Sequence, residues 1–324
     1  MNLGAFMLLY KHVLFSIMLF IVSVLVVRNQ KDVKKIINLI VFSIILTTLF
    51  QVVIYFQLVP ESLLQLLIYD KEWDVIYVNL IRGRYFITIY SSALVPILIY
   101  YSASATKIFY KIIGLFLLLS VLVFSILSNF RTHLVLALLG LFTASAIYIR
   151  KKTVVLIPLG FILLLYLSFQ LNAFLTTSSI TRIVDPDTKD ITSITTRWQW
   201  WQQATEMGLS SPIYGVGLRN YFDNSSNIHI SGLNNKFQLI TLAHPHNIFF
   251  GTFAETGFGG LLALFSLLFY LFVSDVRLFK DTDRLQQALI LSFWILFLFS
   301  TMNPPDTLPY LSLFWLLRAL IYRS

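Results

Sequence analysis

Residues 243–272 read AHPHNIFFGTFAETGFGGLLALFSLLFYLF. From Ile248 onward the run is almost wholly apolar, and it is long enough to cross a bilayer, which takes about 20 helical residues. Its one ionisable residue, Glu255, lies near the start. A charge at membrane depth costs about 2.5–3.5 kcal/mol on insertion scales, so it usually has a partner or a function. Because His246 precedes the helix and histidine titrates near neutral pH, the stretch predicts chemistry at a membrane–water boundary.

The rest of the chain has the same apolar character. It has 324 residues, of which 57% are hydrophobic and 12% are charged, and its mean hydropathy is +0.79. Soluble domains carry about 25% charged residues. We therefore expect an all-α polytopic membrane protein with about nine transmembrane helices and a retained first helix. The expected spans are about 6–27, 36–59, 85–101, 108–127, 134–149, 153–171, 248–273, 286–302 and 308–322.

The basic residues explain the net charge of +9 without nucleic acid. Lysines and arginines concentrate in alternate loops, as they do on the cytoplasmic side of membrane proteins, where they face anionic lipid. This pattern predicts an N-terminus outside and a C-terminus inside. The chain has no cysteine, which excludes disulfides and thiolate chemistry.

Three parts follow from this arrangement: N-terminal transmembrane helices over 1–171 (about six), a large extracytoplasmic loop over 172–247, and C-terminal transmembrane helices over 248–324 (about three). Within the loop, Thr196 and the glutamine three residues later fit a capping box. They predict a short helix from Arg197 to Met207 that Gly208 terminates. Tryptophan prefers the headgroup layer, so this helix serves either as a lipid anchor or as the wall of a site. Its tryptophans are Trp198, Trp200 and Trp201.

Two ionisable residues near the start of the apolar run at 248–272 are candidates for chemistry. His246 is either a structural hydrogen-bonding residue or a general base, which accepts a proton from a hydroxyl nucleophile. His244 precedes it by two positions, but no third ligand at a usual spacing supports a zinc site. Glu255 shares a predicted helix face with Gly251 and Gly259, and a hydrogen bond across the bundle is favoured over catalysis. On an ideal helix it would point away from His246.

Arginines on the expected outer side form a second candidate group. Arginine binds phosphate through two parallel hydrogen bonds, whereas the simpler interpretation is contact with lipid headgroups. Several of them together would suit an anionic, lipid-borne diphosphate. The acidic pair nearest to a metal-binding pattern, Asp185 and Asp187, is a weak candidate, so no metal is expected. The arginines are Arg131, Arg197, Arg82, Arg84 and Arg219.

Three motifs in order carry a family resemblance. They are the run RWQWW at 197–201, the turn PIYGVG at 212–217, and the His246–Asn247 pair followed after nine residues by GFGGL at 257–261. This pattern resembles the bacterial O-antigen ligase and O-antigen polymerase (Wzy-type) superfamily. The resemblance covers about residues 190–265.

The resemblance implies a GT-C-like, metal-independent and inverting membrane glycosyltransferase without a cofactor. It implies that His246 assists deprotonation of the acceptor sugar hydroxyl, and that Arg131 and Arg197 bind the diphosphate of an undecaprenyl-diphosphate-linked glycan. Helper and supporting roles fall to Arg82, Arg84, Arg219, Glu255, Asn247 and His244.

Three functions are consistent with this resemblance and with the charge pattern. The favoured one is a polymerase that joins lipid-linked repeat units into a surface polysaccharide, O-antigen or capsule, at the periplasmic face of the bacterial inner membrane. The second is a ligase that transfers the glycan to lipid A core or another acceptor. The third is a transporter of lipid-linked glycans. Expected partners are the glycan donor and acceptor, membrane lipids, a chain-length regulator and a flippase.

Overall fold

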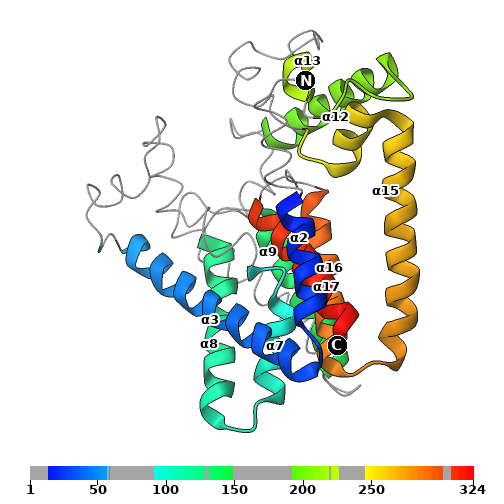
Figure 1. The fold of residues 1–324 in the computed structure, drawn as a ribbon. Coiled ribbons are helices and arrows are strands. Elements are labelled where there is room, and N and C mark those ends of the chain that lie inside the picture. The colour runs from blue at the N-terminus through cyan, green and yellow to red at the C-terminus, as the bar shows by residue number, and fades with distance from the viewer. Residues whose placement is uncertain are drawn as a thin grey trace. The chain divides into compact units, whose positions relative to one another are not determined.

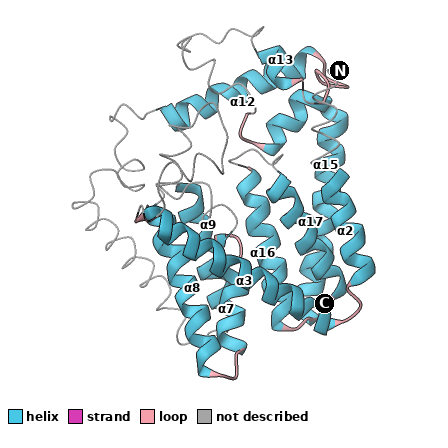
Figure 2. Ribbon diagram, turned by 60° about the vertical axis from the view of Figure 1, so that its left-hand side comes forward, coloured by secondary structure: helices cyan, strands magenta, loops and turns pink. Residues whose placement is uncertain are grey.

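The computed structural model describes residues 14–56, 58, 91–127, 131–148, 192–218, 220–225, 245–301 and 308–324. Over these ranges the chain forms helices and no strands (Figure 1, Figure 2). The all-helical prediction is thus confirmed for the described part. The helices are α2 (Phe15–Val26), α3 (Gln30–Tyr55), α7 (Val95–Ser104), α8 (Ile108–Leu127), α9 (Arg131–Tyr148), α12 (Thr192–Ser210), α13 (Tyr221–Ser225), α15 (Ile248–Asp281), α16 (Arg284–Ser300) and α17 (Leu308–Arg323).

Three of these helices are long and apolar enough to cross a membrane: α3 over Gln30–Phe50, α8 over Ile108–Ser125, and α15. Four shorter apolar helices are found in α2, α7, α9 and α16. These features agree with a helical membrane protein. The expected span at 153–171 lies outside the described residues, as does most of the predicted loop, so nine spans, the large loop and the three-part division stay predictions.

The chain divides into two compact units, each assembled from segments distant in sequence. One comprises residues 27–186, 283–296 and 320–324. Its helices α7, α8 and α9 pack on one another. Gly140 on α9 permits close approach, because a Cβ there would lie 3.1 Å from the Cβ of Val95 and 3.3 Å from the Cδ1 of Ile295. Close packing through glycine is typical of membrane helices.

The other unit comprises residues 1–26, 187–282 and 297–319. It contains α15, the long helix drawn yellow to orange in Figure 1, with α12 and α13 beside its first turns. Near the far end of α15, the carboxylate of Asp275 accepts a 2.6 Å hydrogen bond from the guanidinium of Arg318 on α17. The carboxylate of this ion pair is fully buried.

The helix at the predicted span of 248–273 continues beyond that range to Asp281, and the end of the span itself stays a prediction. Polar residues after 273 suggested a loop, but the buried carboxylate of Asp275 pairs with Arg318, so a charge can remain within the helix. A paired charge is the usual condition for an ionisable residue at membrane depth.

Candidate functional site

Helix α12 forms one wall of the candidate site, and it differs from the predicted helix at both ends. It begins at Thr192 and ends at Ser210, so the capping box at Thr196 is wrong. A capping signal is local, and threonine also occurs inside helices. Gly208 lies within the helix and does not terminate it. A Cβ at Gly208 would collide with the ring of Phe253, so this glycine allows α12 to pack closely against α15.

A break at Gly257 divides α15 into a short first part and a long second part. Gly257 has φ 65° and ψ −161°, a conformation that is essentially restricted to glycine. In a continuous helix the carbonyls of Ala254 and Glu255 would accept bonds from residues 258 and 259. Here both carbonyls instead accept bonds from the turn at 212–217. The predicted common helix face of Glu255 and Gly259 is therefore wrong, since the break separates them.

The PIYGVG turn supplies the bonds that the break leaves open. The amide of Val216 donates to the carbonyl of Ala254 at 2.9 Å, and that of Gly217 donates to Glu255 at 3.0 Å. In return, the amide of Phe258 donates to the carbonyl of Pro212 at 2.7 Å. Two motifs about 40 residues apart are thus one structural element, in which each segment satisfies the backbone groups of the other.

We call the hydrogen-bonded contact between the turn at 212–217 and the Gly257 break the junction. The turn also requires a glycine at this junction. Gly215 has φ 66°, and a Cβ there would collide with the backbone of residues 254–256. The side chains around the junction form a small core of Ala204, Met207, Tyr221 and Ala254. The junction therefore positions the first turns of α15 against α12 and α13.

His246 lies directly before α15 and is held in an uncommon conformation. Its φ is 55°, in the left-handed region where histidine is enriched among non-glycine residues. Its ring stacks on Trp200, with centroids 5.0 Å apart and planes at 25°. The indole N–H of Trp201 donates to the carbonyl of Pro245 at 3.1 Å, and its ring stacks on Phe250 at 5.3 Å. Two of the three tryptophans thus pack on the His246 segment.

Asn247 fixes the start of α15. Its side-chain oxygen accepts bonds from the amides of Phe249 at 2.8 Å and Phe250 at 3.2 Å, which is an N-cap. Its side-chain amide donates to the carbonyl of Thr301 at 2.9 Å. Because the helix begins only at Ile248, ideal helical geometry does not set the angle between His246 and Glu255.

Tyr221 is a site residue that the sequence reasoning missed. It is 1% exposed, and its hydroxyl lies 3.2 Å from the side-chain oxygen of Gln203 and 3.4 Å from the carbonyl of Trp200. Burial raises the pKa of Tyr221, and the negative charge of Glu255 raises it further. The hydroxyl therefore stays protonated as a donor at physiological pH. In the sequence, Tyr221 borders a polar stretch with no periodic signal.

The structure describes only some of the predicted arginines. Arg197 lies on α12 one turn before Trp200 and Trp201, and it is partly exposed. Arg131 is the first residue of α9, and only its backbone is described. The remaining predicted site residues lie outside the described part of the chain. They are Arg82, Arg84, Arg219 and His244.

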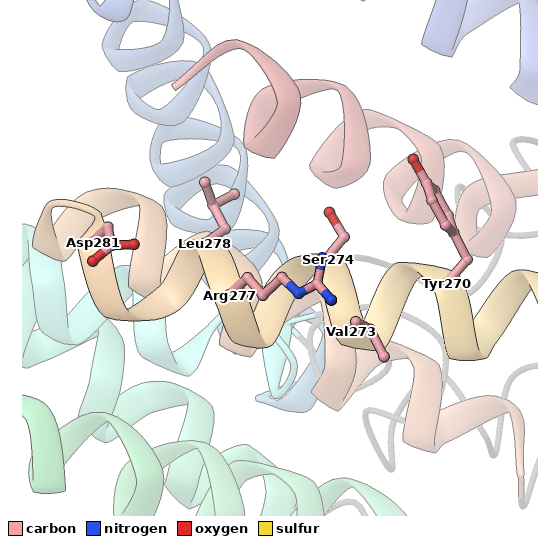
Figure 3. Close-up of a pocket in the computed structure, with 6 residues that line it drawn as sticks. All are labelled: Tyr270, Val273, Ser274, Arg277, Leu278 and Asp281. Atoms are coloured by element: carbon pink, nitrogen blue, oxygen red, sulfur yellow. The ribbon is translucent and has the colours of Figure 1, made fainter.

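Two further observations delimit the site within the described residues. They contain no group of three or more histidine, cysteine or acidic residues that could hold a metal ion. A cavity of about 470 Å³ lies along α15 beyond the break (Figure 3), and none of the described site residues lines it. Its lining residues are Tyr270, Val273, Ser274, Arg277, Leu278 and Asp281.

Comparison with known families gives one match. Residues 113–265 match a family model described as O-antigen ligase. Neither the curated proteins nor the solved structures gave a match. The matched segment includes α12, the PIYGVG turn, His246 and the break at Gly257. Members of this family are glycosyltransferase-like enzymes that act on lipid-linked glycans. The resemblance of this chain to the O-antigen polymerase and ligase superfamily is thereby confirmed.

Proposed function

We propose that the protein is a membrane glycosyltransferase that joins undecaprenyl-diphosphate-linked repeat units into a surface polysaccharide at the periplasmic face of the bacterial inner membrane. One observation carries the proposal. A histidine is held between a tryptophan ring and a helix cap, at the start of a long apolar helix, inside the segment that matches the family. This arrangement supports the proposal, because histidine can accept or release a proton near neutral pH.

In this mechanism the acceptor hydroxyl attacks the anomeric carbon of the donor sugar, and His246 accepts the hydroxyl proton. The bond between that carbon and the diphosphate oxygen breaks, and undecaprenyl diphosphate leaves with the electron pair. A single in-line displacement inverts the anomeric centre. Arg197 and Arg131 bind the diphosphate and neutralise the charge that develops on it, which is the task a metal performs in other enzymes. Arg82, Arg84 and Arg219 are proposed helpers.

The surroundings of His246 suit a base that becomes cationic during the reaction. Trp200 stacks on the imidazole, and the face of an indole ring attracts a cation. Asn247 on one side and the Trp201–Pro245 bond on the other hold the backbone. A base that is fixed before the substrate arrives avoids reorganisation during the chemical step.

A second candidate is a ligase that moves the finished glycan to lipid A core or another acceptor. It is favoured by the description of the matched model as O-antigen ligase. The same residues would serve both reactions, because only the acceptor differs. A chain-length regulator and a flippase are partners proposed for the polymerase. The family match gives no support to a transporter.

Reconstitution tests the proposal. Purified protein in nanodiscs receives undecaprenyl-diphosphate-linked repeat units in the presence of EDTA, and the glycans are resolved by gel electrophoresis. A ladder of lengthening chains supports a metal-independent polymerase. Transfer only after lipid A core is added supports the ligase. No product with either acceptor from folded protein would contradict both.

A further inference from the structure

An apolar surface lies around the PIYGVG turn. Five large apolar side chains at the end of α12, in the turn and just after the Gly257 break are between 47% and 80% exposed. Single exposed apolar residues are common, but a contiguous group marks an interaction surface. We call this group the turn surface. It consists of Leu209 (59%), Ile213 (65%), Tyr214 (80%), Leu218 (47%) and Phe258 (50%).

Backbone bonds and ring contacts join the segments that carry these residues. The amide of Phe258 is bonded to Pro212, next to Ile213. The ring of Phe258 contacts that of Phe253 at 4.7 Å, and Phe253 packs against Gly208, next to Leu209. Residues 207–218 include no charged side chain. The surface is thus apolar and held by the same junction that closes the break in α15.

The length of α15 indicates the level in the bilayer at which the turn surface lies. At 1.5 Å per residue, about 20 helical residues cross the roughly 30 Å hydrocarbon core of a bilayer. Arg277 is exposed near the end of α15, and a charged side chain there fits a membrane boundary. Counting about 20 residues back from Arg277 reaches Phe258. The break at Gly257 therefore coincides with the other boundary, and the turn bonded to it lies at the same level.

Lipid is the occupant that fits this surface. Past the break, exposed apolar side chains continue along α15, including Leu262 at 64% and Phe269 at 70%. The turn surface is continuous with this lipid-facing part, and Tyr214 has the amphipathic ring that favours the headgroup level. On α12, the exposed residues Gln202 and Glu206 present a polar surface instead.

We propose that the turn surface inserts into the interfacial layer of the bilayer at the Gly257 end of α15. Insertion holds the junction, and with it the His246 segment, at the level of the lipid headgroups. Trp200, which stacks on His246, is only 8% exposed and does not supply this role. The inference rests on the membrane-spanning character of α15 and is independent of the proposed reaction.

The absence of cysteine from the chain allows a direct test. Single cysteines at Tyr214 and Ile213 carry a nitroxide label in the full-length protein, reconstituted in liposomes. Collision with oxygen, which partitions into lipid, is compared with collision with a water-soluble nickel complex. Gln202→Cys is the aqueous control and Phe269→Cys is the lipid control. Using two turn positions guards against one variant failing to fold.

The expected oxygen-to-nickel collision ratio at residues 213 and 214 is at least threefold above that at residue 202 and at or below that at residue 269. Equal ratios at 202, 213 and 214 would overturn the proposal, since the turn would then lie in water. Low collision with both reagents at 213 and 214 would also overturn it, because protein and not lipid would cover the surface.

Discussion

Replacing Gly257 by alanine should uncouple the break in α15 from the PIYGVG turn. The backbone of Gly257, with φ 65° and ψ −161°, lies in a region that costs a non-glycine residue about 1–3 kcal/mol. The new Cβ would lie 2.5 Å from the carbonyl oxygen of Pro212 and 2.7 Å from that of Ile213. To relieve this contact the turn must move away, and three backbone hydrogen bonds break.

Each of those bonds contributes about 0.5–1.5 kcal/mol net, so strain and the three lost bonds together give a destabilisation of about 2.5–7.5 kcal/mol. Gly259→Ala is the matched control. Its Cβ would lie 3.3 Å from the carbonyl oxygen of Ile213, which requires a shift of only a few tenths of an ångström, and alanine favours the helix.

Thermal unfolding in detergent and hydrogen–deuterium exchange measure the effect. Gly257→Ala should lower the unfolding temperature and increase exchange at the amides of Val216 and Gly217, while exchange in α8 stays unchanged. Gly259→Ala should resemble the wild type in both measurements. Wild-type protection at these two amides together with a wild-type unfolding temperature in Gly257→Ala would refute this coupling.

Three further changes test other contacts. Asp275→Leu should destabilise the protein by about 3–5 kcal/mol, because it removes the buried carboxylate that pairs with the guanidinium of Arg318, and adding Arg318→Met should restore most of the loss; denaturation of the single and double variants checks this. Asn247→Ser should preserve an N-cap oxygen but lose the bond to the carbonyl of Thr301, so its unfolding temperature should fall less than that of Asn247→Ala, and equal losses would contradict the cap. Trp200→Ala should slow product formation about tenfold, equivalent to about 1.4 kcal/mol, whereas Trp200→Phe should retain most activity because a ring still stacks on His246; equal rates would contradict the positioning role.

Local patterns predicted the helices better than the contacts between them. The apolar run at 108–127 coincides with α8, because length and hydropathy suffice for a membrane helix. By contrast, α12 begins five residues before the predicted start, and α15 extends to Asp281. Within the extended part of α15, Asp275 pairs with Arg318 on another helix, a contact that no local window contains.

In the candidate site, too, local patterns were predicted better than tertiary contacts. The sequence identified His246, Asn247 and the glycine motifs, because proline, glycine and polar residues are visible at the edge of an apolar run. It did not reveal that the turn at 212–217 bonds to the break at Gly257, since a positive φ is not evident from glycine alone. It also missed Tyr221, whose burial depends on α12 and α15 together.

In the proposed reaction, His246 accepts the proton of the acceptor hydroxyl. The most direct measurement compares wild-type protein with His246→Ala in the reconstituted assay, with binding of the lipid-linked donor measured on the same preparations. We expect His246→Ala to fold and to bind the donor with wild-type affinity, but to form no glycosidic product. Near-wild-type product formation by the folded His246→Ala variant would contradict the account.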